Sequence, residues 1–86
     1  MPRRAMLTSC APGGSETGRA GWLLTFHFDA ELIEALKTAI PYFDSYGVTR
    51  EWRKDATEWW VSRDYEHVLG RLFTNFTVFR DAPRLL

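Results

Sequence analysis

The 86-residue sequence predicts an α+β domain, in which a small sheet of three or four strands carries two helices on one face. Residues 22–28 alternate between an apolar face and a more polar face with a period of two, and residues 58–62 are rich in the aromatic and β-branched side chains that strands favour. Residues 29–40 and 64–76 repeat apolar side chains at helical spacing. A short polar turn at residues 55–57 joins two of the strands. We therefore expect the order β-α-β-β-α, with an optional last strand that would complete a split βαβ arrangement.

Residues 1–21 have the composition of a mobile leader, because two prolines and four glycines stand among small polar side chains. Such a segment buries too little apolar surface to offset the entropy lost on ordering. The folded domain is therefore expected to span residues 22–80. Residues 81–86 contain Pro83 and are expected to form a frayed end.

The first strand and the first helix follow each other directly. Alternation in residues 22–28 assigns four side chains to the core face: Trp22, Leu24, Phe26 and Phe28. Asp29 is a suitable N-cap for the helix at residues 29–40, and Pro41 stops that helix because it lacks an N–H donor. Two helices on one sheet face would then cover this strand.

A hairpin of two strands, residues 48–54 and 58–62, is the most distinctive stretch of the chain. Its segment Arg50–Trp60 holds three of the four tryptophans. Alternation predicts that Trp52 and Trp59 face the core and that Trp60 points outward. Gly47, just before the hairpin, allows a turn with positive φ.

The second helix is expected at residues 64–76, capped by Asp64 or Ser62. Gly70 in its interior costs about 1 kcal/mol relative to alanine. This cost suggests that Gly70 marks a close approach of the helix to the sheet. Residues 77–80, TVFR, are predicted to add a last edge strand.

The charge distribution limits the nucleic-acid affinity that the chain can have. The formal net charge is zero, but residues 22–79 contain six basic and nine acidic side chains. A strong non-specific nucleic-acid binder is basic, because neutralisation of phosphates drives its affinity. Binding of nucleic acid would therefore be local to the hairpin.

The sequence gives little support to catalysis, metal binding or a cofactor. His27 and His67 belong to different elements, and no Cys pair or His pair has the spacing of a metal site. Cys10 is the only cysteine, so no intramolecular disulfide forms and a cytoplasmic location is the default expectation. No apolar run is long enough to span a bilayer. We expect a protein that is not an enzyme.

Two binding functions are consistent with the hairpin. In the first, basic side chains engage phosphates while an outward tryptophan stacks on an exposed base. The residues assigned to this nucleic-acid site are Arg50, Arg53, Lys54, Trp60 and Arg63. In the alternative, an exposed aromatic anchor binds a protein partner or a second copy of the chain, as aromatic hot spots do. The residues assigned to that anchor are Tyr42, Tyr46 and Trp60.

Residues 26–73 resemble the HARP domain, the small module that accompanies annealing helicases of the SWI/SNF class. The match consists of an apolar strand followed by a short helix, then an Arg-x-aromatic unit seven residues before a tryptophan, then an Asp-Tyr pair. The matching residues are Phe28, Leu32, Ile33, Leu36, Lys37, Arg50, Trp52, Trp59, Val61, Asp64 and Tyr65. Arg53 and Lys54 replace the family's Asp-Pro turn, and the chain has no helicase motor. The resemblance implies a preference for single-stranded or forked DNA, no ATPase activity, and a DNA-binding role for Arg50.

Overall fold

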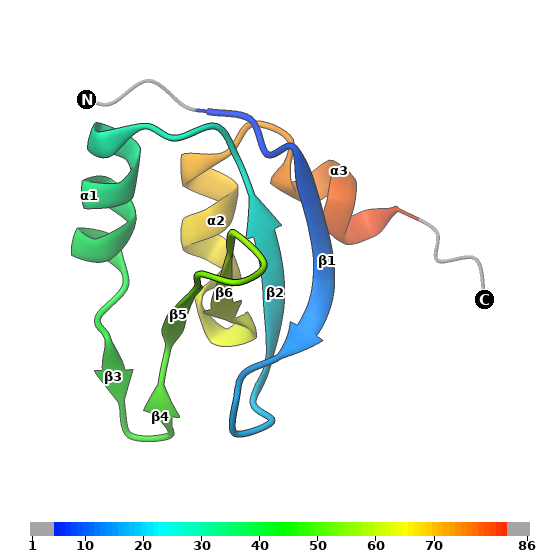
Figure 1. Ribbon diagram of the computed structural model, residues 1–86. Coiled ribbons are helices and arrows are strands. Elements are labelled where there is room, and N and C mark those ends of the chain that lie inside the picture. Colours follow the sequence, from blue (N-terminus) through cyan, green and yellow to red (C-terminus); the bar gives the residue numbers. More distant parts are fainter. Residues whose placement is uncertain (1–4, 83–86) are drawn as a thin grey trace.

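A four-stranded antiparallel sheet in the order β1-β2-β6-β5 forms the centre of the molecule (Figure 1). The structure is a computed structural model that describes residues 5–82. The four strands are β1 (Ser9–Gly14), β2 (Ala20–Thr25), β5 (Arg50–Arg53) and β6 (Glu58–Ser62). A separate two-stranded ladder is formed by β3 (Phe43–Asp44) and β4 (Gly47–Val48).

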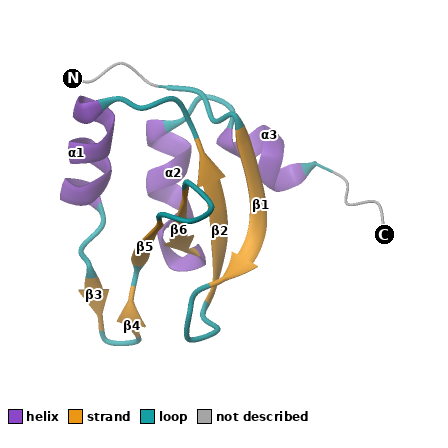
Figure 2. Cartoon of the chain, viewed as in Figure 1, coloured by secondary structure: helices purple, strands orange, loops and turns teal. Residues whose placement is uncertain are grey.

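Three α-helices stand side by side against the sheet, with α2 between α1 and α3 (Figure 2). They are α1 (Ala30–Ala39), α2 (Glu66–Leu72) and α3 (Phe76–Asp81), and a 3-10 turn, η1 (Arg63–Tyr65), leads into α2. The predicted α+β class is therefore confirmed. The element order differs at both ends, where a strand is added before β2 and a helix replaces the last predicted strand. It also differs in the middle, where Val48 of the predicted strand at residues 48–54 belongs to the β3–β4 ladder and only residues 50–53 form β5.

The core lies between the helices and one face of the sheet. Trp22 of β2 meets Phe76 of α3 edge to face, with ring centroids 5.5 Å apart. The core residues are Leu7, Cys10, Trp22, Leu24, Leu32, Leu36, Ile40, Trp59, Val61, Val68, Leu69, Phe73 and Phe76. Burial of so many large side chains is what allows a domain of this size to fold.

The prediction of a mobile leader is wrong for residues 5–21. β1 pairs with β2 along its whole length, and Leu7 and Cys10 are buried in the core. Further back, the Ala5 amide donates to the Leu72 carbonyl at 3.0 Å, and the Thr74 amide donates to the Ala5 carbonyl at 2.8 Å. The sheet thus has an edge strand that composition alone did not indicate, while residues 1–4 lie outside the described part.

The predicted strand at residues 77–80 is instead part of the helix α3. Phe76 is fully buried and Phe79 packs against the core from one turn later, a spacing that fits a helix face. The predicted frayed end overlaps α3 at Asp81, and residues 83–86 lie outside the described range.

The tryptophans of the hairpin differ from the prediction in which of them are buried and which are exposed. Trp59 is buried in the core as expected. Trp60 is 0% exposed, although it lies on the face away from the helices, whereas Trp52 is 51% exposed. Trp60 is covered because its indole crosses β2 and its Nε1 donates to the Gly13 carbonyl of β1 at 3.1 Å. The outer face of the sheet is therefore shielded from solvent at this position.

Local features of the first helix and of the glycines were partly predicted. Asp29 caps α1, since its Oδ1 accepts a hydrogen bond from the Leu32 amide at 3.2 Å. Gly47 has the expected positive φ of 113°. Phe28 is not in the core and is 81% exposed, because β2 ends at Thr25 and the alternation ends with it. Gly70 marks no close approach, since a Cβ there would meet nothing within 4 Å.

Candidate functional site

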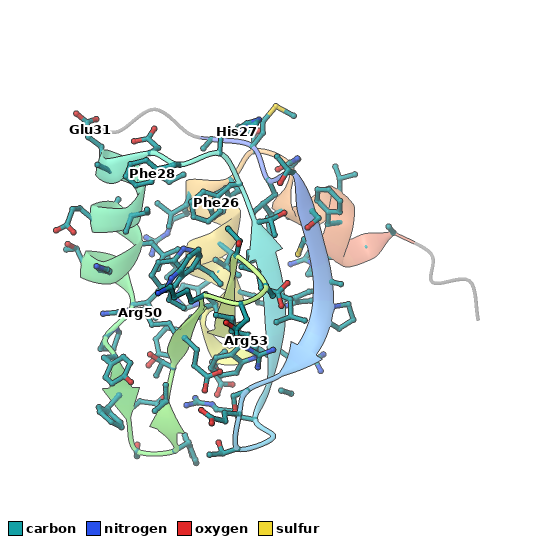
Figure 3. All side chains as sticks on the ribbon, in the orientation of Figure 1. Phe26, His27, Phe28, Glu31, Arg50 and Arg53 are labelled. Carbon is teal, nitrogen blue, oxygen red and sulfur yellow. The ribbon has the colours of Figure 1, made fainter. Side chains whose placement is uncertain are left out.

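An open groove between α1 and β5 is the most distinctive concave surface in the described part of the chain. Its volume is about 640 Å³, within the range of small-ligand pockets. We call it the aromatic groove; its lining residues are Phe28, Ile33, Lys37, Tyr42, Arg50, Trp52 and Trp59. Figure 3 shows Phe28 at the start of α1 and Arg50 on the side of β5 that faces this helix.

Three aromatic rings of the groove are open to solvent. Phe28, Tyr42 and Trp52 are 81%, 50% and 51% exposed. Trp52 leans on buried Trp59, with ring centroids 5.4 Å apart, so its orientation is supported from below. Large rings held in this way offer flat apolar surfaces to a planar ligand.

Two cationic side chains accompany these rings. The Nε of Arg50 donates to the Ile40 carbonyl at the end of α1, 3.0 Å away. Its guanidinium lies 5.5 Å from the centroid of the Tyr42 ring, within the range of a cation–π interaction. Lys37, on the last turn of α1, is exposed. None of the described residues that line the aromatic groove carries a carboxylate.

Thr49 fixes the position of Tyr42 in the groove. Its amide donates to the Tyr42 carbonyl at 3.0 Å, and its carbonyl accepts from the Ser62 amide of β6 at 2.8 Å. The hydroxyl of Thr49 also donates to the Pro41 carbonyl. A fully buried residue thus ties the segment after α1 to the sheet.

A second hollow of about 650 Å³ adjoins the aromatic groove and has the opposite electrostatic character. It shares Tyr42 and Trp52 with the groove. Its charged residues are four acidic and two basic side chains: Glu16, Glu51, Asp55, Glu58, Arg53 and Lys54. A ligand that extends from the groove past Trp52 would therefore meet an excess of negative charge.

An ion-pair network centred on Arg19 fixes the β3–β4 hairpin beside the site. Arg19 binds Asp44 through two nitrogens, at 3.0 and 2.8 Å, and binds Asp64 at 2.9 Å. The hydrogen bond from Arg19 lowers the pKa of Asp44 to about 2, and the same pairing raises the pKa of Arg19. Burial, together with a hydrogen bond to Asp44, raises the pKa of Tyr65. The β3–β4 hairpin has only two pairs of strand residues, and the bonds from Arg19 to Asp44 and to the Val48 carbonyl hold its two strands in place.

The structure does not bring the five predicted nucleic-acid residues together. Arg50 lies in the aromatic groove, but Arg53 is on the opposite face of β5, where its Nη2 donates to the Gly14 carbonyl at 2.5 Å (Figure 3). Lys54 is exposed in the β5–β6 turn, and Arg63 is exposed near α3. Trp60 is fully buried and cannot stack on a ligand.

The predicted protein anchor is also divided. Tyr42 belongs to the groove, whereas Tyr46 is 82% exposed on the β3–β4 hairpin, with the Arg19 guanidinium 5.9 Å from its ring centroid. Trp60 is excluded from this anchor for the same reason as above. Phe43, which belongs to neither predicted site, is exposed beside Tyr42, with ring centroids 4.7 Å apart.

Sequence reasoning missed Phe28, Lys37 and Trp52 as site residues. Alternation with neighbouring buried residues predicts a core position for both Phe28 and Trp52. The signal that could have identified Phe28 is its position directly before the N-cap Asp29, where a strand has already ended. Lys37 lies on the solvent-facing side of a helix, and only the packing of α1 beside β5 shows that it lines a groove.

No group of three or more His, Cys, Asp or Glu side chains is placed to hold a metal ion in residues 5–82. Within the same range, no helix has both the length and the apolar character needed to cross a membrane.

The chain was compared with protein-family models, with curated proteins and with solved structures, and none of them matches it.

Proposed function

We propose that the protein is a non-catalytic module that binds single-stranded or forked DNA in the aromatic groove. The observation that carries the proposal is the combination of three exposed rings with two cations and no lining carboxylate. Rings stack on unpaired bases and neighbouring cations engage phosphates, the combination that single-strand binders use. The resemblance to the HARP domain, which includes Arg50 and Trp52, supports the same ligand class.

Each groove residue has a proposed role that follows from its geometry. Trp52 and Tyr42 stack on bases, and Phe28 extends the stacking surface toward α1. Arg50 engages a phosphate with its terminal nitrogens while its Nε remains on the Ile40 carbonyl. Lys37 engages a second phosphate. Of the five residues predicted from the sequence only Arg50 is kept, and Arg53, Lys54, Trp60 and Arg63 are replaced.

Residues 5–82 contain eight basic and eleven acidic side chains, so the affinity is expected to be modest. Fluorescence anisotropy with a labelled twelve-nucleotide single strand at low salt tests the function. We expect binding at micromolar protein, and weaker binding of a blunt duplex of the same length. No binding of the single strand at several hundred micromolar protein would contradict the proposal.

A matched pair of variants shows whether the aromatic groove is the site. Trp52→Leu removes a stacking surface and is expected to weaken binding about 5- to 150-fold, equivalent to about 1–3 kcal/mol per stacked base. Tyr46→Leu removes a ring that lies outside the groove and is more exposed than Trp52, and it should leave binding unchanged. Equal effects of the two variants would place the site elsewhere.

A second candidate function is self-association through the β3–β4 hairpin. It is favoured by the exposed rings of Phe43 and Tyr46, held on a hairpin that the Arg19–Asp44 ion pair makes rigid. Aromatic side chains on rigid supports are frequent interface hot spots. Light scattering would detect the dimer, and a Tyr46→Ala variant should return it to monomer. A wild-type protein that is monomeric at high concentration rules this function out.

A further inference from the structure

The number of cations in the aromatic groove limits how much phosphate charge it can neutralise. Lys37 and Arg50 are the two basic residues of its lining. The Nε of Arg50 is occupied by the Ile40 carbonyl, so that side chain contributes its two terminal nitrogens at one fixed place. Two cations at two positions engage about two phosphates.

Carboxylates lie at both ends of the groove. At the α1 end, Asp29 follows Phe28 directly and Glu31 stands two positions later. Figure 3 shows Glu31 and Phe28 at the same end of the helix. At the β5 end, the adjoining hollow begins at Trp52 and contains four carboxylates against two basic side chains, one of which is Arg53. Arg53 is already held by the Gly14 carbonyl and lies 3.4 Å from Glu51. A phosphate backbone that continues in either direction would meet repulsion.

From this arrangement, which rests on the proposed function, we infer that the aromatic groove binds a short single-stranded DNA segment of about two to three nucleotides. Stacking on three exposed rings is then the main source of affinity, and charge is the minor one. An OB-fold, by comparison, covers about 4–16 nucleotides. A short site of this kind suits gaps, flaps and strand ends, where a few bases are unpaired.

A length series tests the size of the site. Quenching of intrinsic tryptophan fluorescence measures binding of unlabelled dT2, dT3, dT4, dT8 and dT12. The expected affinity per site, corrected for the number of overlapping positions, rises to dT3 or dT4 and then stays constant. A corrected affinity that continues to rise from dT4 to dT12 would overturn the short site, and the proposed function would stand. No quenching by any length would overturn both.

Salt dependence measures the number of phosphates directly. For single strands, log Kd changes with log salt by about 0.7 for each neutralised phosphate. Two phosphates give a slope of about 1.4, which is about 25-fold weaker binding of dT4 at 200 mM than at 20 mM NaCl. A slope of three or more requires at least four phosphates and contradicts the inference. Arg50→Gln should lower the slope by about 0.7, whereas Arg71→Gln, on exposed α2 surface, should not change it.

Removal of the acidic boundary provides the sharpest test. The double variant Asp55→Asn, Glu58→Gln neutralises two carboxylates of the adjoining hollow. It should strengthen binding of dT8 severalfold and leave binding of dT3 unchanged, because only the longer strand reaches the hollow. Equal effects on both lengths would show that the carboxylates do not limit the site.

Discussion

The indole Nε1 of Trp60 donates a hydrogen bond to the Gly13 carbonyl, 3.1 Å away on the far side of β2. Gly21 of β2 makes this contact possible. A Cβ at that position would lie 2.6 Å from the Trp60 Nε1 and closer still to the Val61 carbonyl oxygen. The absence of a side chain in β2 thus lets an indole from β6 reach β1.

Gly21→Ala is predicted to destabilise the protein by about 1–3 kcal/mol, because the methyl group forces the indole or the β6 backbone to move. Gly70→Ala is the matched control. A Cβ there meets nothing within 4 Å, so the change should stabilise α2 by up to about 1 kcal/mol. Urea unfolding of both variants measures the effect. A Gly21→Ala variant as stable as the wild type would contradict this account of the sheet.

Trp60→Phe and Trp52→Phe are predicted to act on different properties. Trp60→Phe removes the donor to the partly buried Gly13 carbonyl and part of a fully buried indole, and it should cost about 1–3 kcal/mol. Trp52→Phe changes a half-exposed ring and should alter stability by less than about 0.5 kcal/mol while weakening DNA binding. Thermal unfolding measures the stability of each variant, and titration with DNA measures its affinity. Reversed results would restore the sequence-based roles of the two residues.

The Arg19–Asp44 ion pair should make stability depend on pH in acid. The pKa of Asp44 is about 2 in the folded state and 3.8 in the unfolded state, so the carboxylate stabilises the fold above about pH 4. That stabilisation is lost as the pH falls toward 2.

Asp44→Asn should therefore lower Tm at pH 7, and roughly a third of that difference should remain at pH 2.5. Differential scanning calorimetry at both pH values measures it. Asp55→Asn, in the exposed β5–β6 turn, is the control. A difference in Tm between the wild type and Asp44→Asn that is the same at both pH values would show that the ion pair does not contribute.

Asp29→Ala is predicted to cost about 1 kcal/mol, because the Leu32 amide loses its acceptor and the first turn of α1 loses a favourable negative charge. Asp29→Asn keeps an acceptor and should recover most of the loss. Chemical denaturation compares the three proteins. Equal destabilisation by both variants would indicate that the carboxylate acts through something other than the cap.

Elements with strong local signals could be predicted from the sequence. The cap at Asp29, the helix after it and the strand at residues 58–62 follow from side-chain chemistry and periodicity. β1 could not be predicted, because its Pro-Gly-Gly segment has no alternation to detect. Its Gly13 is instead engaged by Trp60, from a strand 47 residues away.

The burial of the tryptophans shows a related limit of prediction from the sequence. Alternation correctly places neighbouring Trp59 and Trp60 on opposite faces, but it does not tell which faces are covered. Here both faces are covered at β6, and the edge strand β5 leaves Trp52 open. For the same reason the five residues of the predicted nucleic-acid site do not lie together, and only the packing of α1 beside β5 shows which exposed rings line the aromatic groove.

The contacts of Ala5 with Leu72 and Thr74 make the order of synthesis relevant to folding. Leu7 adds a pair of hydrogen bonds to Asn75, at 2.8 and 3.0 Å, across 68 positions of sequence. Contacts between such distant positions slow folding, because a long loop must close before they form. On the ribosome, β1 can pair with β2 as soon as residues 20–25 have emerged, whereas Ala5 and Leu7 lack these distant partners until the chain beyond α2 has emerged. The N-terminal edge of the sheet is therefore expected to form in two steps, with β1 joining β2 early and residues 5–7 joining the segment after α2 last.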